Sequence, residues 1–442
     1  MLNTSRLRFL KRSGGDTGEL ALAGAAFLST TSFGLTVPIL PLFLRQLAAP
    51  GAAESGLWAG LAIGISPLFS AMAMPLWGTL GDRFGHKIMM QRALACMALT
   101  LFLLALAAQP WHVVVLRAMG GAFGGLGAAI TAAVSVSIPQ ERLGHSIGTI
   151  QTAQTMGLLV GPIAGGVLSD LVGPRLAFAT GAVCLGIGLT AVSRRYRDPP
   201  RLARRPAPSP GLAARLQSAR TAVGAIRPLW VLLPSLFAIQ FVDGGYTVLL
   251  PFHLEALGAP APLLARLVGG TLSATAIAMA VATVSIGRTV TPPRVRGLLA
   301  MMLGAGAGFS VLAAVSSAWW FFAACRVLLG FTLGAVPTLV YVAAAASSPT
   351  DRQGVVLGMV TSVGLIAWAS SPLLTGALTA SHPRWVLGFY VALCGSAVMV
   401  LGWNRRPELR GTGDAAMRPP GLAGTLRLAL RKRQKAVTDD TK

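Results

Sequence analysis

The chain alternates between long apolar runs and short polar connections. A run of about 20 apolar residues is long enough to cross a bilayer as a helix. Twelve such runs occur, and the short connections between most of them favour antiparallel neighbours. The expected spans cover residues 20–47, 57–80, 88–109, 111–138, 143–172, 175–192, 229–257, 263–287, 295–317, 319–347, 353–380 and 385–403. The pattern predicts an all-α polytopic membrane protein.

One long connection, residues 193–228, divides the spans into six and six. It holds nine arginines, several prolines and the single acid Asp198. We therefore expect the chain to be organised as a cytoplasmic N-terminus 1–19, a six-helix bundle 20–192, a basic cytoplasmic linker 193–228, a second six-helix bundle 229–403 and a basic cytoplasmic tail 404–442.

The two halves repeat each other at an offset of about 210 residues. "VPILPLFLRQLAAP" from Val37 aligns with "TVLLPFHLEALGAP" from Thr247. Further pairs are Pro162 with Pro372, Gly166 with Gly376 and, one residue out of step, Arg117 with Arg326. Repeated halves of six spans are typical of secondary transporters, whose substrate site lies near the midplane where the halves meet. The sequence thus predicts two pseudo-symmetric six-helix bundles.

Charge is scarce and unevenly placed. Only 12% of residues are charged, against about 25% in soluble domains, and 37 Lys and Arg face 14 Asp and Glu. The bases gather in the connections on one side, while the other side keeps only Arg45, Arg175, Arg266 and Arg384. This is the positive-inside pattern rather than a nucleic-acid surface. We expect a monomer in a bacterial inner membrane, in contact with lipids, with both termini cytoplasmic.

Ionisable groups at membrane depth are costly and are therefore functional candidates. Asp243, at the centre of span 229–257, is a candidate proton or cationic-substrate site, with Tyr246 and Gln240 three residues to either side on the same helix face. The alternative is a structural acid paired with a distant base. Arg117 is suited to tuning an acid or binding a polar substrate. Its repeat partner Arg326 has helix packing and snorkelling as its alternative.

Other kinds of chemistry leave no trace in the sequence. Nothing has the pattern of a nucleotide-binding loop, a catalytic triad or a metal cluster. No cysteine spacing suggests a disulfide framework or a metal site. The four cysteines lie in apolar runs: Cys96, Cys184, Cys325 and Cys394. We expect a protein that is not an enzyme, binds no metal or cofactor and does not draw its energy from ATP.

A polar stretch, "GTLGDRFGHK" from Gly78, follows the second span and is expected in a loop. Such a cluster could latch the bundles together on one face, or be an ordinary solvated loop. Here the chain resembles the major facilitator superfamily over essentially its whole length. The family signature G-x-L-a-D-r-x-G-r-k is matched by Gly78, Leu80, Asp82, Arg83, Gly85 and Lys87, with departures at Gly81 and His86. The resemblance implies a latch that stabilises the outward-facing state. The degraded counterpart "GRTVTPPRVRG" from Gly287 implies an asymmetric one.

A second motif narrows the resemblance. "GLLVGPIAGG" in the fifth span fits the pattern G-x-x-x-G-P-x-x-G-G throughout, through Gly157, Gly161, Pro162, Gly165 and Gly166. It resembles the antiporter signature of the drug–proton (multidrug efflux) branch, although a packing seam of small residues is the alternative. The resemblance implies export of small amphipathic or hydrophobic compounds by proton antiport with alternating access.

One departure leaves the coupling site open. Many such exporters carry an acid in span one or four, and this chain has none in either, so coupling would rest on Asp243 or on Asp82, Asp170 or Glu255. Two other functions also stay open. One is export of a specific metabolite such as a sugar or siderophore, and the other is a non-transporting membrane sensor or lipid-handling protein.

Overall fold

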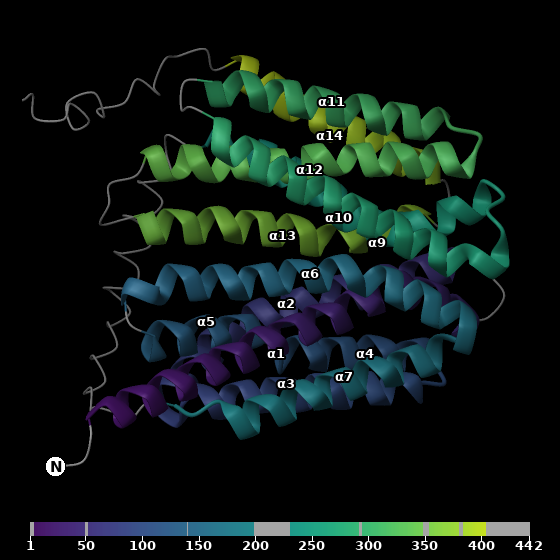
Figure 1. Cartoon of the computed structure of the whole chain (residues 1–442). Coiled ribbons are helices and arrows are strands. Elements are labelled where there is room, and N and C mark those ends of the chain that lie inside the picture. The colour runs from purple at the N-terminus through teal and green to yellow at the C-terminus, as the bar shows by residue number, and fades with distance from the viewer. Residues whose placement is uncertain are drawn as a thin grey trace, which may run out of the picture. The chain divides into compact units, whose positions relative to one another are not determined.

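The computed structural model describes residues 4–48, 52–138, 140–198, 230–290, 294–347, 353–379 and 383–403. The helices are α1 (Thr4–Leu47), α2 (Ala52–Phe84), α3 (His86–Ala105), α4 (Pro110–Ala122), α5 (Leu126–Ser137), α6 (Gln140–Val172), α7 (Pro174–Arg195), α9 (Leu233–Ala256), the short η2 (Ala261–Leu263), α10 (Leu264–Thr289), α11 (Val295–Val315), α12 (Trp319–Ser347), α13 (Gln353–Thr379) and α14 (Pro383–Trp403). They provide twelve candidate membrane spans within these ranges, which confirms the predicted fold class (Figure 1).

The fourth span differs from its prediction. Residues 111–138 were expected as one helix, but the structure has α4 and α5 with a break at Phe123–Gly125. Gly125 has φ 83°, a left-handed conformation that side-chain-bearing residues rarely adopt. The two helices still count as one apolar span. Gly124 and Gly125 therefore interrupt the helix inside this apolar span.

The junction between α2 and α3 also differs from the prediction. The stretch from Gly78 to Lys87 was expected in a loop, but α2 continues to Phe84 and α3 begins at His86. Gly85 alone joins them, with φ 100°. Asp82 and Arg83 therefore lie in the last turn of a helix, because one glycine is enough to reverse the chain direction. The Asp82 side chain lies outside the described residues.

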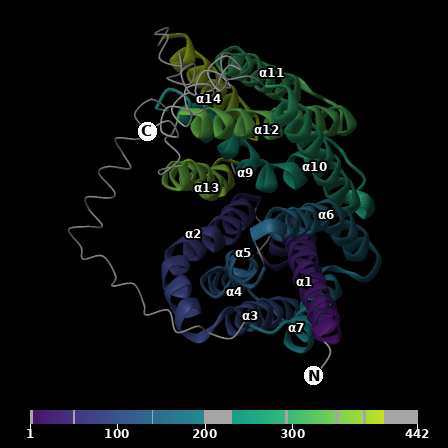
Figure 2. The same cartoon turned by 60° about the vertical axis from the view of Figure 1, so that its left-hand side comes forward.

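Two clusters of buried apolar side chains form the cores. One draws on residues 22–196 together with Val248, and the other on residues 232–401. Figure 2 shows α1 to α7 as one group of helices and α9 to α14 as a second. The two predicted six-helix bundles are therefore present. Most of the 193–228 linker and the whole 404–442 tail lie outside the described residues, so the predictions for them stay untested.

The bundles meet along two seams related by the repeat. In one, α6 packs on α10, and a methyl group added at Gly269 would overlap the Pro162 carbonyl. In the other, α13 packs on α2, and a methyl group at Gly60 would overlap the Pro372 carbonyl. Both contacts lie toward the end at which α1 leads to α2 and α9 leads to η2 and α10, here named the charge-poor end. Its opposite is the basic end.

Two ion pairs join the bundles near the same end. Arg45 of α1 pairs with Glu255 of α9, and these residues occupy equivalent positions in the repeat, 210 apart. Arg266 of α10 pairs with Asp170 of α6 through its Nε, 3.1 Å from Oδ2. The Arg266 backbone N–H also donates to the same carboxylate over 3.2 Å. Close packing and ion pairing therefore hold the charge-poor end together in this conformation.

Candidate functional site

Both carboxylate oxygens of Asp243 accept a hydrogen bond. Arg326 of α12 donates from Nη2 to Oδ1 over 2.8 Å, and Trp368 of α13 donates from Nε1 to Oδ2 over 3.2 Å. The Arg326 side chain is 2% exposed and the Asp243 side chain 20% exposed. A guanidinium so deeply buried needs a counter-charge, and the Asp243 carboxylate supplies it. Arg326 therefore does not snorkel toward an interface.

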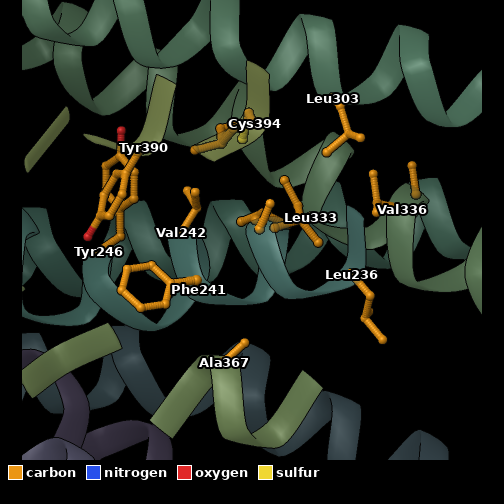
Figure 3. Packing of buried hydrophobic residues seen from close by; sticks show 14 of the residues in the cluster. Leu236, Phe241, Val242, Tyr246, Leu303, Leu333, Val336, Ala367, Tyr390 and Cys394 are labelled. Atoms are coloured by element: carbon orange, nitrogen blue, oxygen red, sulfur yellow. The ribbon is translucent and has the colours of Figure 1, made fainter. Parts of the chain in front are cut away.

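Aromatic rings surround the ion pair. The Arg326 Cζ lies 4.7 Å from the centroid of the Tyr246 ring, a cation–π distance. Tyr246 in turn lies against Tyr390, with ring centroids 5.6 Å apart (Figure 3). The Tyr390 hydroxyl shares a 2.8 Å hydrogen bond with the Thr375 hydroxyl. The Arg326–Asp243 pair thus lies beside two tyrosine side chains of the second bundle, each with an aromatic ring and a polar hydroxyl.

The site holds more donors than acceptors. The Nε and Nη1 groups of Arg326 and the hydroxyl of Tyr246 are buried, with no hydrogen-bond partner. Unpaired buried donors are costly, and water or a ligand acceptor would satisfy them. Gln240, one turn before Asp243, lies beside Gly364 of α13. The arrangement can therefore hold a proton on Asp243 or redirect Arg326 to another acceptor.

Arg117 lies apart from this cluster. Its Nε donates to the Ala62 carbonyl of α2 over 3.2 Å, and its Cζ lies 5.9 Å from the centroid of the Phe33 ring of α1. The structure thus brings Asp243, Tyr246 and Arg326 together and leaves Arg117 in the first bundle.

Trp368 was not among the residues singled out from the sequence. Tryptophans of membrane proteins concentrate at the two membrane–water interfaces. Trp368 instead falls near the middle of the expected span 353–380, and that displacement is the sequence signal that could have identified it. Its indole N–H is the second donor to Asp243.

The "GLLVGPIAGG" segment of α6 lies against two helices. Gly157, Gly161 and Gly165 face α1, where added methyl groups would overlap Phe27, Thr31 and Leu35 backbone atoms. Gly166 faces Ala265 of α10. The motif therefore forms a close seam that includes the contact between bundles at Pro162.

Lys87, the last residue of the 78–87 motif, makes its hydrogen bonds to residues at the end of the first bundle. The Lys87 ammonium donates to the Ser193 carbonyl over 2.8 Å, and the Lys87 backbone N–H donates to both Asp198 carboxylate oxygens over 3.2 Å. Next to it the Tyr196 hydroxyl bonds Ser137 over 2.8 Å. Burial raises the pKa of the Tyr196 phenol to about 12, so it is neutral at cellular pH. These contacts anchor the start of α3 to the end of α7.

No metal site appears in the described residues. They contain no group of three or more His, Cys, Asp or Glu side chains placed to hold an ion. All four cysteines are free.

Comparison with known families identifies the fold. The family described as Major Facilitator Superfamily matches residues 22–301 and 265–436. The chain belongs to the major facilitator superfamily. This membership confirms the resemblance inferred from the two motifs.

Several similar members of this superfamily are multidrug resistance proteins named MdtG. The protein from Citrobacter koseri is 28% identical over 406 residues, covering 87% of this chain and 94% of that protein. The one from Proteus mirabilis is 31% identical over 325 residues, covering 71% of this chain and 78% of that protein. The superfamily member described here therefore lies in the multidrug efflux branch.

Solved structures of the superfamily share the fold. A bacterial homolog of the human lysosomal transporter Spinster, in an inward-facing and occupied conformation, matches with a TM-score of 0.70 and 14% identity over 87% of this chain and 95% of that one. The nucleoside transporter NupG matches with a TM-score of 0.68 and 13% identity, over 88% and 100% of the two chains. At these identities the likeness shows the fold alone. Together with the MdtG relatives, family membership makes the protein an integral membrane transporter of small molecules, and not an enzyme.

Proposed function

We propose that the protein exports small amphipathic or hydrophobic compounds from a bacterial cell in exchange for protons. The observation that carries the proposal is the Asp243 carboxylate at membrane depth, held by Arg326 and Trp368 in a chain similar to multidrug resistance proteins. The proton gradient supplies the energy and no cofactor takes part. The protein works as a monomer, with both termini in the cytoplasm.

Protonation of Asp243 provides the coupling step. The ionised carboxylate pairs with Arg326, and a proton removes the charge that holds this pair together. The change reaches the contact between bundles through α13. Ala369, next to Trp368, lies against Gly64 of α2, where an added methyl group would come within 2.8 Å of the Ala369 carbonyl oxygen. A proton on Asp243 thereby alters the balance between the two alternating conformations.

An efflux assay tests the proposal. The protein is expressed in a host that lacks its own pumps, and accumulation of a panel of cationic, neutral and anionic dyes and antibiotics is measured with and without a protonophore. We expect several amphipathic compounds to be kept out of the cells, and collapse of the gradient to end this. Movement of a single metabolite would support the specific-exporter alternative. Accumulation equal to that of empty cells for every compound would refute export.

The orientation is a separate prediction. In a variant without native cysteines, Ser209→Cys places a thiol in the linker, and Gln109→Cys places one between α3 and α4 at the charge-poor end. An impermeant maleimide added to intact cells should label the second thiol and spare the first, because the positive-inside rule puts the linker in the cytoplasm. Labelling of the linker thiol alone would show that the linker faces the outside of the cell and that the predicted orientation is wrong.

A further inference from the structure

Arg92 of α3 has an incompletely satisfied guanidinium. Its Cζ lies 3.4 Å from the centroid of the Trp77 ring of α2, and its Nη2 donates to the Gly124 carbonyl over 2.9 Å. Its Nε and Nη1 groups are buried and have no hydrogen-bond partner. A charged group with unpaired buried donors is destabilising unless an acceptor is supplied.

Trp77 is fixed in place by the break between α4 and α5. Its indole N–H donates to the Ala122 carbonyl over 2.6 Å, and its ring centroid lies 5.8 Å from that of Phe123. The end of α4 therefore positions Trp77, and Trp77 in turn positions the Arg92 guanidinium. The break that interrupts the fourth span thus builds one wall of this arrangement.

A cavity of about 160 Å³ opens beside these groups. Its lining includes Met74, Trp77, His86, Met89, Arg92 and Gly124. Since one water occupies about 30 Å³ of liquid, the cavity has room for a tetrahedral oxyanion rather than a single water. The lining comes from the second half of α2, the first turns of α3, the end of α4 with the α4–α5 break, and the first turns of α5. The cavity therefore lies in the basic-end half of the first bundle.

The chemistry of the lining indicates the ligand. An arginine fork matches the oxygen spacing of phosphate and carboxylate groups. The imidazole of His86, which can donate a hydrogen bond, also lines the cavity. Met74, which lines the cavity, is an exposed apolar side chain, and further exposed apolar side chains lie on the same part of α2 and at the start of α3: Leu76, Phe84 and Ile88. In a protein that crosses a bilayer, such side chains suit the acyl chains of a lipid.

We propose that this cavity is an anion site in which Arg92 binds the phosphate group of an anionic phospholipid from the leaflet at the basic end. A soluble phosphate offers the same oxygens without the acyl chains. The site is separate from the Asp243 cluster, because its residues belong to α2, α3, α4, α5 and the α4–α5 break and not to α9, α12 or α13.

Lipid retention in native mass spectrometry tests this site on the full-length protein. Wild type, Arg92→Gln and Arg92→Lys are incubated with phosphatidylglycerol and phosphatidylcholine in detergent. We expect wild type to retain phosphatidylglycerol about tenfold more than Arg92→Gln does, as loss of a charged hydrogen bond predicts. Arg92→Lys should fall between them, since it keeps the charge and loses the fork. Equal retention by wild type and both variants would overturn the proposal.

Two further variants separate ligand binding from folding. Arg175→Gln is the matched control, because Arg175 also lies over an aromatic ring, that of Phe43, but donates to the Ala105 and Ala107 carbonyls. It should retain lipid as wild type does. Ala132→Leu fills part of the cavity and leaves Arg92 in place. It should lose phosphatidylglycerol, and normal retention by this variant would place the lipid elsewhere.

Thermal unfolding distinguishes the two sources of phosphate. Delipidated protein is heated in inorganic phosphate or in chloride at equal ionic strength, and again with phosphatidylglycerol in mixed micelles. Stabilisation of wild type but not Arg92→Gln by the lipid alone assigns a lipid site. If inorganic phosphate stabilises wild type as much as phosphatidylglycerol does, the site binds a soluble phosphate rather than a lipid. An identical response of wild type and Arg92→Gln to both additives would contradict an anion site at Arg92.

Discussion

Asp243→Asn is expected to abolish gradient-driven efflux. An amide has nearly the size of the protonated acid but cannot cycle between charged and neutral forms, so the exchange of a proton for substrate stops. Accumulation of substrate in cells carrying the variant should equal that in empty cells. Counterflow of substrate without a proton gradient should persist, because it requires no change of protonation.

The partner of Asp243 calls for a second variant. Removing one member of a buried ion pair costs about 3–5 kcal/mol, because the remaining charge is uncompensated, and Arg326 is 2% exposed. Asp243→Asn could thus fail through misfolding. The double variant Asp243→Asn, Arg326→Gln removes the stranded charge as well. It should restore expression and counterflow if the single variant misfolds, and still lack gradient-driven efflux.

Glu255→Gln provides the matched control for loss of a carboxylate. The side chain of Glu255 is part-exposed beside Arg45, and exposed ion pairs contribute about 0–1 kcal/mol. Efflux within about fivefold of wild type is therefore expected. An active, proton-dependent Asp243→Asn variant would falsify the assignment, and a Glu255→Gln variant without efflux would move the coupling to the charge-poor end.

The twelve spans were predictable because the bilayer leaves the backbone few choices. Each spanning segment must satisfy its own hydrogen bonds, so a long apolar run becomes a helix. Short-range departures were not predictable. The glycines at 124 and 125 sit inside an apolar run, and nothing in that pattern indicates that Gly125 adopts a positive φ. The end of α2 was also missed, because a charged segment such as Asp82–Arg83 can extend a helix beyond the membrane.

The sequence identified Asp243 and Arg326 as candidate residues, but it did not predict that they form an ion pair with each other. Depth in the membrane identified Asp243, and the repeat identified Arg326 through Arg117. The pairing depends on the rotation of α9 and α12 about their own axes, which hydropathy does not specify, so the alternative of a distant base was left open. Trp368 and Arg92 were missed for a related reason. A residue compatible with an interface is not distinguished from one that turns inward until the neighbouring helices are placed.

Gly269→Val is expected to disable transport by a different route, through the contact between the bundles. The added side chain would overlap the Pro162 carbonyl, so α10 and α6 must move apart at the charge-poor end. Overpacking of this kind costs about 1–3 kcal/mol, which shifts a two-state equilibrium about 5- to 150-fold. The population of the conformation with a closed charge-poor end therefore falls relative to the open one, and efflux falls by a similar factor.

Gly270→Val separates this effect from a general loss of helix quality. Gly270 is the next residue of α10, and an added methyl group there meets no atom within 4 Å. Both variants place the same β-branched residue in the same helix turn, so their intrinsic effects on the helix match. Spin labels on Gln109→Cys and Ala261→Cys, one on each bundle at the charge-poor end, should report a longer distance in Gly269→Val than in Gly270→Val.

Gly60→Val, at the repeat-equivalent seam on Pro372, should behave as Gly269→Val does. If Gly269→Val and Gly270→Val transport equally well, the seam does not limit the conformational cycle, and the ion pairs Arg45–Glu255 and Arg266–Asp170 become the contacts to test.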